Sequence, residues 1–127
     1  MTLICGLPNS GKTTYSNRYE DVIHLDDIRQ YSECNKIVSA KVDAVVEGVY
    51  NKRKHRLQLL SGCRDSYNVC IWMDTPIEEC MNREMAYRKR NCFIIYNNKM
   101  EPPEFSEGWD EIIIVHPDCS EKVLKGD

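Results

Sequence analysis

The feature that most constrains this chain is a glycine-bounded stretch near its N-terminus, residues 6–13, with the sequence GLPNSGKT. It fits the pattern G-x-x-x-x-G-K-[ST], and it lies between the short apolar run Leu3–Cys5 and a helix-like stretch. Glycines at both ends allow the backbone to curl, so that successive N–H groups point at phosphate oxygens. The pattern therefore predicts a nucleotide-phosphate site between the first strand and the first helix.

The side chains of this stretch have separate predicted roles. We expect Lys12 to reach the β- and γ-phosphates as a positive charge, and the Thr13 hydroxyl to ligate Mg²⁺. The positive N-terminal end of the following helix adds to the anion site. The residues expected to contact the nucleotide are Gly6, Pro8, Asn9, Ser10, Gly11, Lys12, Thr13 and Thr14. A glycine-rich turn that binds nothing is the alternative.

Length and composition narrow the class of protein. The 127 residues predict one domain, residues 1–127, with a single core. The formal net charge is −3, so any contact with nucleic acid must come from a local basic face. Seven cysteines without a C-x-x-C pair favour reduced thiols over disulfides or zinc, with Cys5 and Cys70 buried in strands. No signal peptide is visible and no apolar run approaches the roughly 20 residues of a membrane helix, so we expect a cytoplasmic protein.

Apolar runs alternate with helix-like stretches along the chain. This pattern predicts an α/β fold in which helices flank a largely parallel sheet of about five strands. The expected strands are Thr2–Cys5, Val22–Leu25, Ala44–Glu47, Asn68–Trp72 and Glu111–Val115. The expected helices are Lys12–Arg18, Lys52–Leu60 and Pro76–Arg90, with weaker ones at Asp27–Tyr31 and Ile94–Met100. At the best-marked helix start, Thr75 is the expected N-cap, Pro76 the first helical residue and Glu78 the partner in a capping box.

Two acids, Asp26 and Asp27, follow the second expected strand, and Arg29 follows them. Ligands of an open parallel sheet bind beyond the carboxyl ends of its strands, and the glycine-bounded stretch lies at the same edge. A carboxylate there can accept the proton of an attacking hydroxyl, and an arginine can orient an anionic substrate. We assign the first role to Asp26 and the second to Arg29. Alternatively, one acid caps the next helix and the other is solvated, which is what we expect of Asp27.

The third expected strand ends in Glu47, which can hold a water of Mg²⁺ or orient the arginine of the preceding motif. An edge carboxylate without a ligand is the alternative. The basic stretch Asn51–Arg56 comes next. Such a stretch is usually the solvated face of a helix; otherwise it contacts substrate phosphates, as we expect for Asn51. We expect His24 to face the core or the edge of the sheet.

Residues 80–90 carry three arginines, Arg83, Arg88 and Arg90, near the end of the expected helix Pro76–Arg90. Phosphoryl transfer needs cations above the migrating group as well as beneath it, and a mobile lid usually supplies them. We expect Arg83 to come from the helix end, and Arg88 or Arg90 from the lid. Cations that only complement the helix C-terminus are the alternative.

Taken in order, these motifs resemble the phage-type polynucleotide kinase group of P-loop kinases. The likeness rests on the phosphate loop, Asp26-Asp27-x-Arg29, the acid Glu47 with the arginines that follow it, Asp74-Thr75-Pro76 and the arginine lid. The tail segments 101–103 and 107–112 are also similar to the segment that leads into the last strand of that group.

The resemblance implies transfer of phosphate from ATP to a 5′-hydroxyl of DNA or RNA. It implies that Lys12 and Thr13 hold nucleotide and metal, that Asp26 is the general base, and that Arg29 contacts the substrate phosphate. Arg83 and Arg88 match the paired lid arginines, although the spacing is one residue longer here, and Arg90 competes with Arg88. Glu47 stands where that group has an aspartate.

Two intervals, residues 30–42 and 91–100, are short for an acceptor channel of that group. A small hydroxylated metabolite such as a nucleoside or a sugar is therefore an alternative acceptor, and a nucleotide-binding module without phosphotransfer is a third hypothesis. The expected partners are ATP with Mg²⁺ and either a nucleic-acid 5′ end or a small nucleotide-like acceptor, but no membrane.

Overall fold

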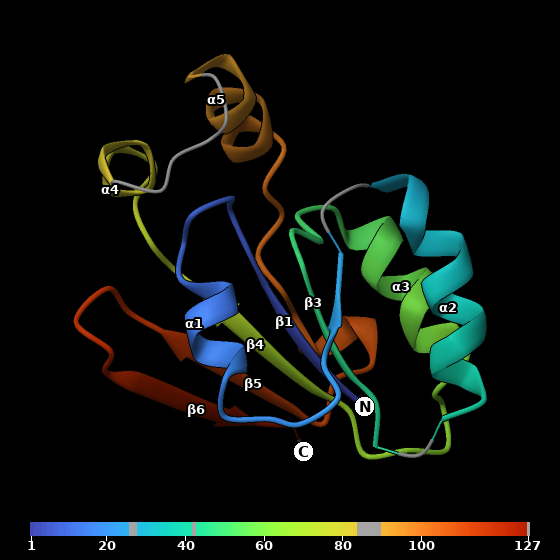
Figure 1. The fold of residues 1–127 in the computed structure, drawn as a ribbon. Coiled ribbons are helices and arrows are strands. Elements are labelled where there is room, and N and C mark those ends of the chain that lie inside the picture. The colour runs from blue at the N-terminus through green and yellow to red at the C-terminus, as the bar shows by residue number, and fades with distance from the viewer. Residues whose placement is uncertain (26–27, 42, 84–89, 127) are drawn as a thin grey trace.

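The computed structural model describes residues 1–25, 28–41, 43–83 and 90–126 (Figure 1). Its sheet has six strands in the order β2-β3-β1-β4-β5-β6. The strands are β1 Thr2–Gly6, β2 Ile23–His24, β3 Val45–Gly48, β4 Val69–Met73, β5 Glu111–Val115 and β6 Glu121–Lys125. All neighbouring pairs are parallel except β5 and β6, which are antiparallel. The predicted α/β class with a mostly parallel sheet is confirmed.

The helices connect these strands and lie on both faces of the sheet (Figure 1). They are α1 Lys12–Ser16, α2 Tyr31–Ser39, α3 Arg53–Ser61, α4 Ile77–Asn82 and α5 Arg90–Asn98, with 3₁₀ turns η1 Ile28–Gln30 and η2 Phe105–Glu107. In Figure 1, α2 and α3 lie side by side, whereas α4 and α5 stand above the carboxyl ends of the strands. Within the described ranges, no helix is long and apolar enough to span a membrane.

Alternation along the central strands divides the core between the two faces of the sheet. Leu3 and Cys5 of β1 belong to the larger apolar cluster, which includes residues of α2 and α3. Ile4, between them in sequence, belongs to the second cluster with Tyr15 of α1. Successive side chains of a strand point to opposite faces, so the helices cover β1 from both sides.

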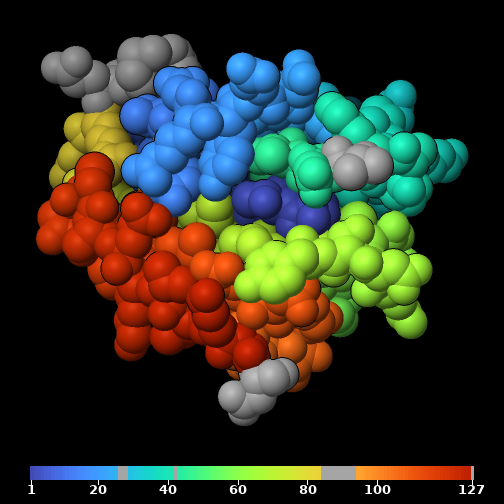
Figure 2. Space-filling model, turned by 90° about the horizontal axis from the view of Figure 1, so that it is seen from below, coloured from blue at the N-terminus to red at the C-terminus, as the bar shows by residue number. Residues whose placement is uncertain are grey.

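The first residue of the chain packs into the core, directly before β1. Met1 is buried, and its ammonium group donates a hydrogen bond to the carbonyl oxygen of Tyr67 at 2.9 Å. Figure 2 shows this N-terminal segment, in dark blue, near the centre of the face seen from below.

The predicted burial of two strand cysteines is also confirmed: Cys5 and Cys70 are fully buried, with their Sγ atoms 3.7 Å apart. Burial raises the pKa of the Cys70 thiol.

Some predicted elements differ from the structure. Strand β6 was not expected, because its sequence EKVLK has no apolar run and its side chains are mostly exposed. Its lysines are typical of an edge strand, where charge opposes pairing with another chain. Residues 31–39 form α2 where no helix longer than a turn was expected. The expected helix Pro76–Arg90 ends early, because Arg83 has extended backbone (φ −69, ψ 142).

The basic stretch before and within α3 is not a solvated face throughout. Arg56 is fully buried, and its guanidinium donates from Nε and Nη2 to both carboxylate oxygens of Glu107, at 2.8 and 2.9 Å. Its Nη1 donates to the carbonyl oxygen of Tyr50 at 2.8 Å, and the indole of Trp109 donates to Glu107 at 3.0 Å. The prediction of a solvated face is therefore wrong for Arg56, because a carboxylate that is distant in sequence neutralises the guanidinium inside the core.

Replacement of Arg56 by methionine should destabilise the fold by about 3–5 kcal/mol, because the buried Glu107 carboxylate loses both short hydrogen bonds from the guanidinium. Arg53→Met is the matched control. Arg53 is 39% exposed and lies 3.7 Å from Glu104 and 4.0 Å from Glu107, so the loss of these longer, partly solvated ion pairs should cost less than about 1 kcal/mol. Urea unfolding of the two variants measures the difference. Equal losses would contradict the assignment of Arg56 as the buried structural charge.

Candidate active site

The glycine-bounded stretch forms a tight loop between β1 and α1. Three of its residues have positive φ angles: Gly6 (153), Asn9 (64) and Gly11 (102). A Cβ atom on Gly6 would lie 2.7 Å from Ser10 Oγ and 2.9 Å from the carbonyl oxygen of Met73. The first glycine is therefore required both by its backbone conformation and by the close approach of β4.

The polar groups of the loop suit a phosphate chain. Lys12 is buried, and its ammonium donates a hydrogen bond to the carbonyl oxygen of Leu7 at 2.7 Å, so the cation lies under the curled loop. Ser10 Oγ is buried and has no hydrogen-bond partner within the described part of the chain. Thr13 and Thr14 are exposed in the first turn of α1. Because a buried hydroxyl and a buried cation converge on a loop that needs glycine, these residues fit ATP phosphates, with the Thr13 oxygen available to Mg²⁺.

Three side-chain hydrogen bonds fasten the loop to the chain that follows β4. Thr75 Oγ1 donates to the carbonyl oxygen of Ser10 at 3.0 Å, and Asn9 Nδ2 donates to that of Cys80 at 2.8 Å. Arg83 Nη1 donates to the carbonyl oxygen of Asn9 at 3.0 Å. The phosphate loop is thus bonded to α4 and to the residues just before and after that helix, as well as to its own lysine.

Thr75 corrects one sequence prediction. It is not the N-cap of α4: Pro76 occupies that position, the helix begins at Ile77, and no side chain caps it. The Thr75 hydroxyl instead binds the phosphate loop, a role that the sequence analysis missed. The available signal was its position just beyond β4, at the sheet edge that also carries the loop.

Arg83 lies at the loop, as its predicted role requires. Besides its bond to Asn9, its Nη2 lies 3.2 Å from a carboxylate oxygen of Glu79, one helical turn earlier. A Cβ atom on Gly11 would lie 3.4 Å from Arg83 Nη1, so the guanidinium stands directly beside the second loop glycine. Arg88 lies outside the described residues, and so does the side chain of Arg90, whose backbone begins α5.

The predicted acceptor side follows β2 and β3. Asp26 and Asp27 lie outside the described residues, and Arg29 is exposed in η1. Glu47 is 5% exposed and accepts a hydrogen bond from His24 Nδ1, at 2.9 Å, when that nitrogen is protonated. His24 is half-exposed on the edge strand β2, so of its two expected places, the core and the edge of the sheet, the structure shows the second.

Glu47 lies on β3 opposite Ile4 of β1, and therefore close to the strand that enters the phosphate loop. Asn51 is buried, and its side-chain amide donates to the carbonyl oxygen of Tyr96 in α5 at 3.0 Å. The chain after α5 returns to the same residue, because the amide of Glu101 donates to the Asn51 carbonyl oxygen at 2.8 Å. Asn51 thus ties α5 to the loop after β3, and substrate contacts of Arg29, Glu47 and Asn51 stay predictions.

Solved structures of two kinases share this fold. A gluconokinase from Sinorhizobium meliloti 1021 superposes with a TM-score of 0.67 at 12% sequence identity, covering 91% of this chain and 81% of that chain. A sugar kinase from Janibacter sp. HTCC2649 superposes with a TM-score of 0.62 at 14% identity, covering 91% of this chain and 83% of that chain. No protein-family model and no curated protein sequence matches the chain.

The chain therefore shares the fold of these two kinases. At these identities the likeness extends to the fold alone. Neither structure is a member of the phage-type polynucleotide kinase group that the sequence motifs resemble, so membership of that group stays a prediction.

We expect Thr75→Val to weaken ATP binding about tenfold, because the carbonyl of Ser10 loses its buried hydrogen-bond donor and the loop loses one tether. Thr75→Ser keeps the hydroxyl and should bind ATP as the wild type does. Isothermal titration calorimetry with ATP measures both affinities. Equal affinities for the valine and serine variants would show that this tether does not shape the loop.

His55 should make stability depend on pH. It is buried in α3 in a T-shaped contact with the Tyr31 ring, and burial, followed by Lys54 and Lys52, lowers its pKa below the ordinary value of 6.5. The neutral form is favoured in the folded state, so its contribution is complete above the unfolded pKa and is lost as the pH falls below it. The urea midpoint should therefore fall between about pH 7 and about pH 5, and His55→Gln should lessen that fall. His116→Gln is the control, because the His116 side chain is 43% exposed.

Proposed function

We propose that the chain is an ATP-dependent phosphotransferase whose acceptor is the hydroxyl of a small metabolite. The observation that carries this proposal is the phosphate loop, with Lys12 buried beneath it and Arg83 bonded to its backbone. The loop lies at the sheet edge that also carries Glu47 and the chain leading to Arg29. Two cations and a curled row of amides at one point suit the triphosphate of a nucleotide.

In this proposal the loop amides and Lys12 hold the phosphates of ATP, and Thr13 supplies one oxygen ligand to Mg²⁺. The metal, when bound, neutralises negative charge on the phosphates. Asp26 takes the proton from the acceptor hydroxyl, whose oxygen bonds to the γ-phosphorus as the bond to the ADP oxygen breaks. Arg83 and Arg88 balance charge on the phosphoryl group during transfer, and Arg29 binds an anionic group of the acceptor.

Two observations favour a small acceptor. Residues 31–39, where an acceptor channel would need space, form a helix that buries Tyr31, Cys34 and Val38 in the core. The two solved kinases of the same fold are named for gluconate and for a sugar, which are small polyhydroxy compounds. A 5′-hydroxyl end of a polynucleotide is the second candidate, and the Asp26-Asp27-x-Arg29 motif favours it.

A transfer assay with γ-labelled ATP and a panel of acceptors tests the proposal. The panel consists of D-gluconate, adenosine and a short oligodeoxynucleotide with a 5′-hydroxyl end. Labelled product from gluconate or adenosine, and little from the oligonucleotide, is the expected result. Label on the oligonucleotide alone would favour the second candidate. Binding of ATP without labelled product would instead indicate a nucleotide-binding module.

Asp26→Asn should reduce transfer by at least about 100-fold, because the amide cannot accept the hydroxyl proton. Its affinity for ATP should stay within about twofold of the wild type, because the phosphate loop is unchanged. Asp27→Asn is the matched control and should keep most of the activity. Steady-state kinetics and calorimetry give both quantities. Normal turnover of the Asp26 variant would remove the assignment of the general base.

A further inference from the structure

Tyr50 has an unusual backbone for a large aromatic residue. Its φ angle is 36, in the left-handed region, and the residue is fully buried. Residues other than glycine, asparagine and aspartate seldom adopt this backbone conformation. Such a conformation persists only where the surrounding structure holds the residue in place. The contacts of Tyr50 should therefore show what the conformation is for.

Both backbone polar groups and the ring of Tyr50 are held. Its amide donates to the Tyr31 hydroxyl at 3.1 Å, and its carbonyl oxygen accepts from Arg56 Nη1 at 2.8 Å. Its ring stacks on that of Tyr31, with centroids 4.1 Å apart and planes 10° apart. A Cβ atom on Gly48 would lie 3.1 Å from the Tyr50 ring, so the glycine at the end of β3 makes room for the stack.

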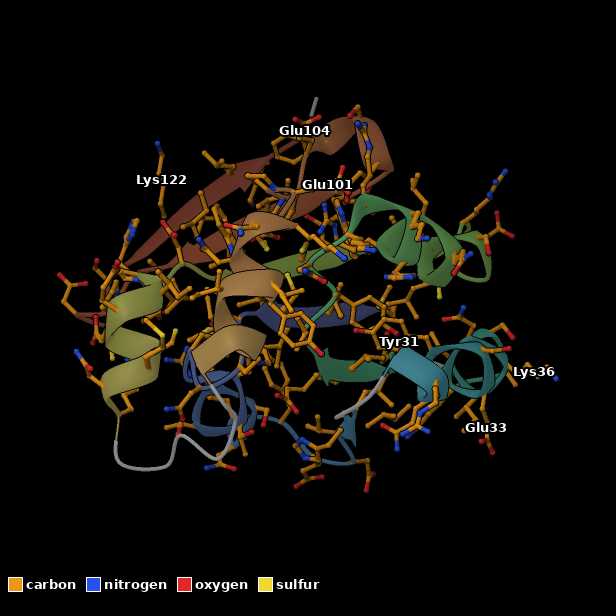
Figure 3. All side chains as sticks on the ribbon, turned by 90° about the horizontal axis from the view of Figure 1, so that it is seen from above. Tyr31, Glu33, Lys36, Glu101, Glu104 and Lys122 are labelled. Carbon is orange, nitrogen blue, oxygen red and sulfur yellow. The ribbon has the colours of Figure 1, made fainter. Side chains whose placement is uncertain are left out.

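These contacts join the two halves of the proposed site. The residue before Tyr50, Val49, accepts a hydrogen bond at 3.3 Å from the amide of Gly6, the first glycine of the phosphate loop. Tyr31 is the first residue of α2 and directly follows η1, the turn that contains Arg29. Figure 3 labels Tyr31 at this start of the helix. The stack thus lies between the loop assigned to ATP and the turn assigned to the acceptor.

We propose that Tyr31 is a positioning residue for the acceptor. Its hydroxyl holds Tyr50 in the left-handed conformation, and its ring fixes the start of α2 against the same residue. Together they set the place of the η1 turn, with Arg29, relative to the phosphate loop. The inference rests on the proposed function, because it concerns the acceptor of that reaction. Stabilisation of the core alone is the competing explanation, and it predicts no selective effect on the acceptor.

The test compares Tyr31→Phe with Tyr50→Phe. Each variant loses one hydroxyl of the same stacked pair, but the bond to the Tyr50 amide is lost in Tyr31→Phe alone. With whichever of gluconate, adenosine or the 5′-hydroxyl oligonucleotide the wild type phosphorylates, Tyr31→Phe should raise the acceptor KM about tenfold. Its affinity for ATP should be unchanged, and Tyr50→Phe should keep the wild-type acceptor KM. Hydrogen–deuterium exchange over residues 48–51 should be faster in Tyr31→Phe than in Tyr50→Phe.

The outcomes separate this inference from the proposed function. If the wild type transfers phosphate but both variants raise the acceptor KM equally, or neither does, the positioning role is overturned and the proposed function stands. If the wild type phosphorylates no acceptor, the proposed function fails and the inference fails with it, whatever the exchange rates are. Should Tyr31→Phe not fold, exchange in the wild type decides: the acceptor, but not ATP alone, must slow exchange over residues 48–51.

Discussion

The parallel pairing of β1 between β3 and β4 is the constraint on which the site depends. The register places Ile4 opposite Glu47 on one side and Gly6 opposite Met73 on the other. Three carboxyl ends therefore meet at one edge of the sheet, and the chain beyond each end reaches the same place. The parallel register therefore brings three groups close together: the amides of the loop, the Thr75 hydroxyl and the segment around Tyr50.

The loop itself is held by groups from both neighbours of β1. On the side of β4, Thr75, Cys80 and Arg83 bond its apex. On the side of β3, Val49 accepts a bond from the amide of Gly6. A loop with three positive φ angles is costly to order by itself, and such restraint before a ligand arrives reduces the ordering that binding requires. The same contacts connect the loop to α4 and to the chain after β3.

How much of this could be predicted from sequence depended on whether the signal was local. The phosphate loop was predicted from its glycine positions and one lysine. The five strands β1 to β5 were predicted from apolar runs. The buried state of Arg56 could not be found, because its partner Glu107 lies 51 positions away and the local sequence is indistinguishable from a solvated basic helix face. The N-cap prediction for Thr75 was wrong for the opposite reason. The local sequence carries a complete capping signal, but in the folded chain the Thr75 hydroxyl bonds to the Ser10 carbonyl instead.

The buried arginine also explains how a strained residue can persist next to the site. A guanidinium without solvent requires both a carboxylate and further acceptors, and Glu107 together with the Tyr50 carbonyl meets this need. Release of Tyr50 from its left-handed conformation would move that carbonyl and leave one arginine donor unsatisfied in the core. The electrostatics of the core and the geometry of the junction thus support each other. The conformation of Tyr50 is accordingly held more firmly than its own contacts with Tyr31 would achieve, as the proposed positioning role of Tyr31 requires.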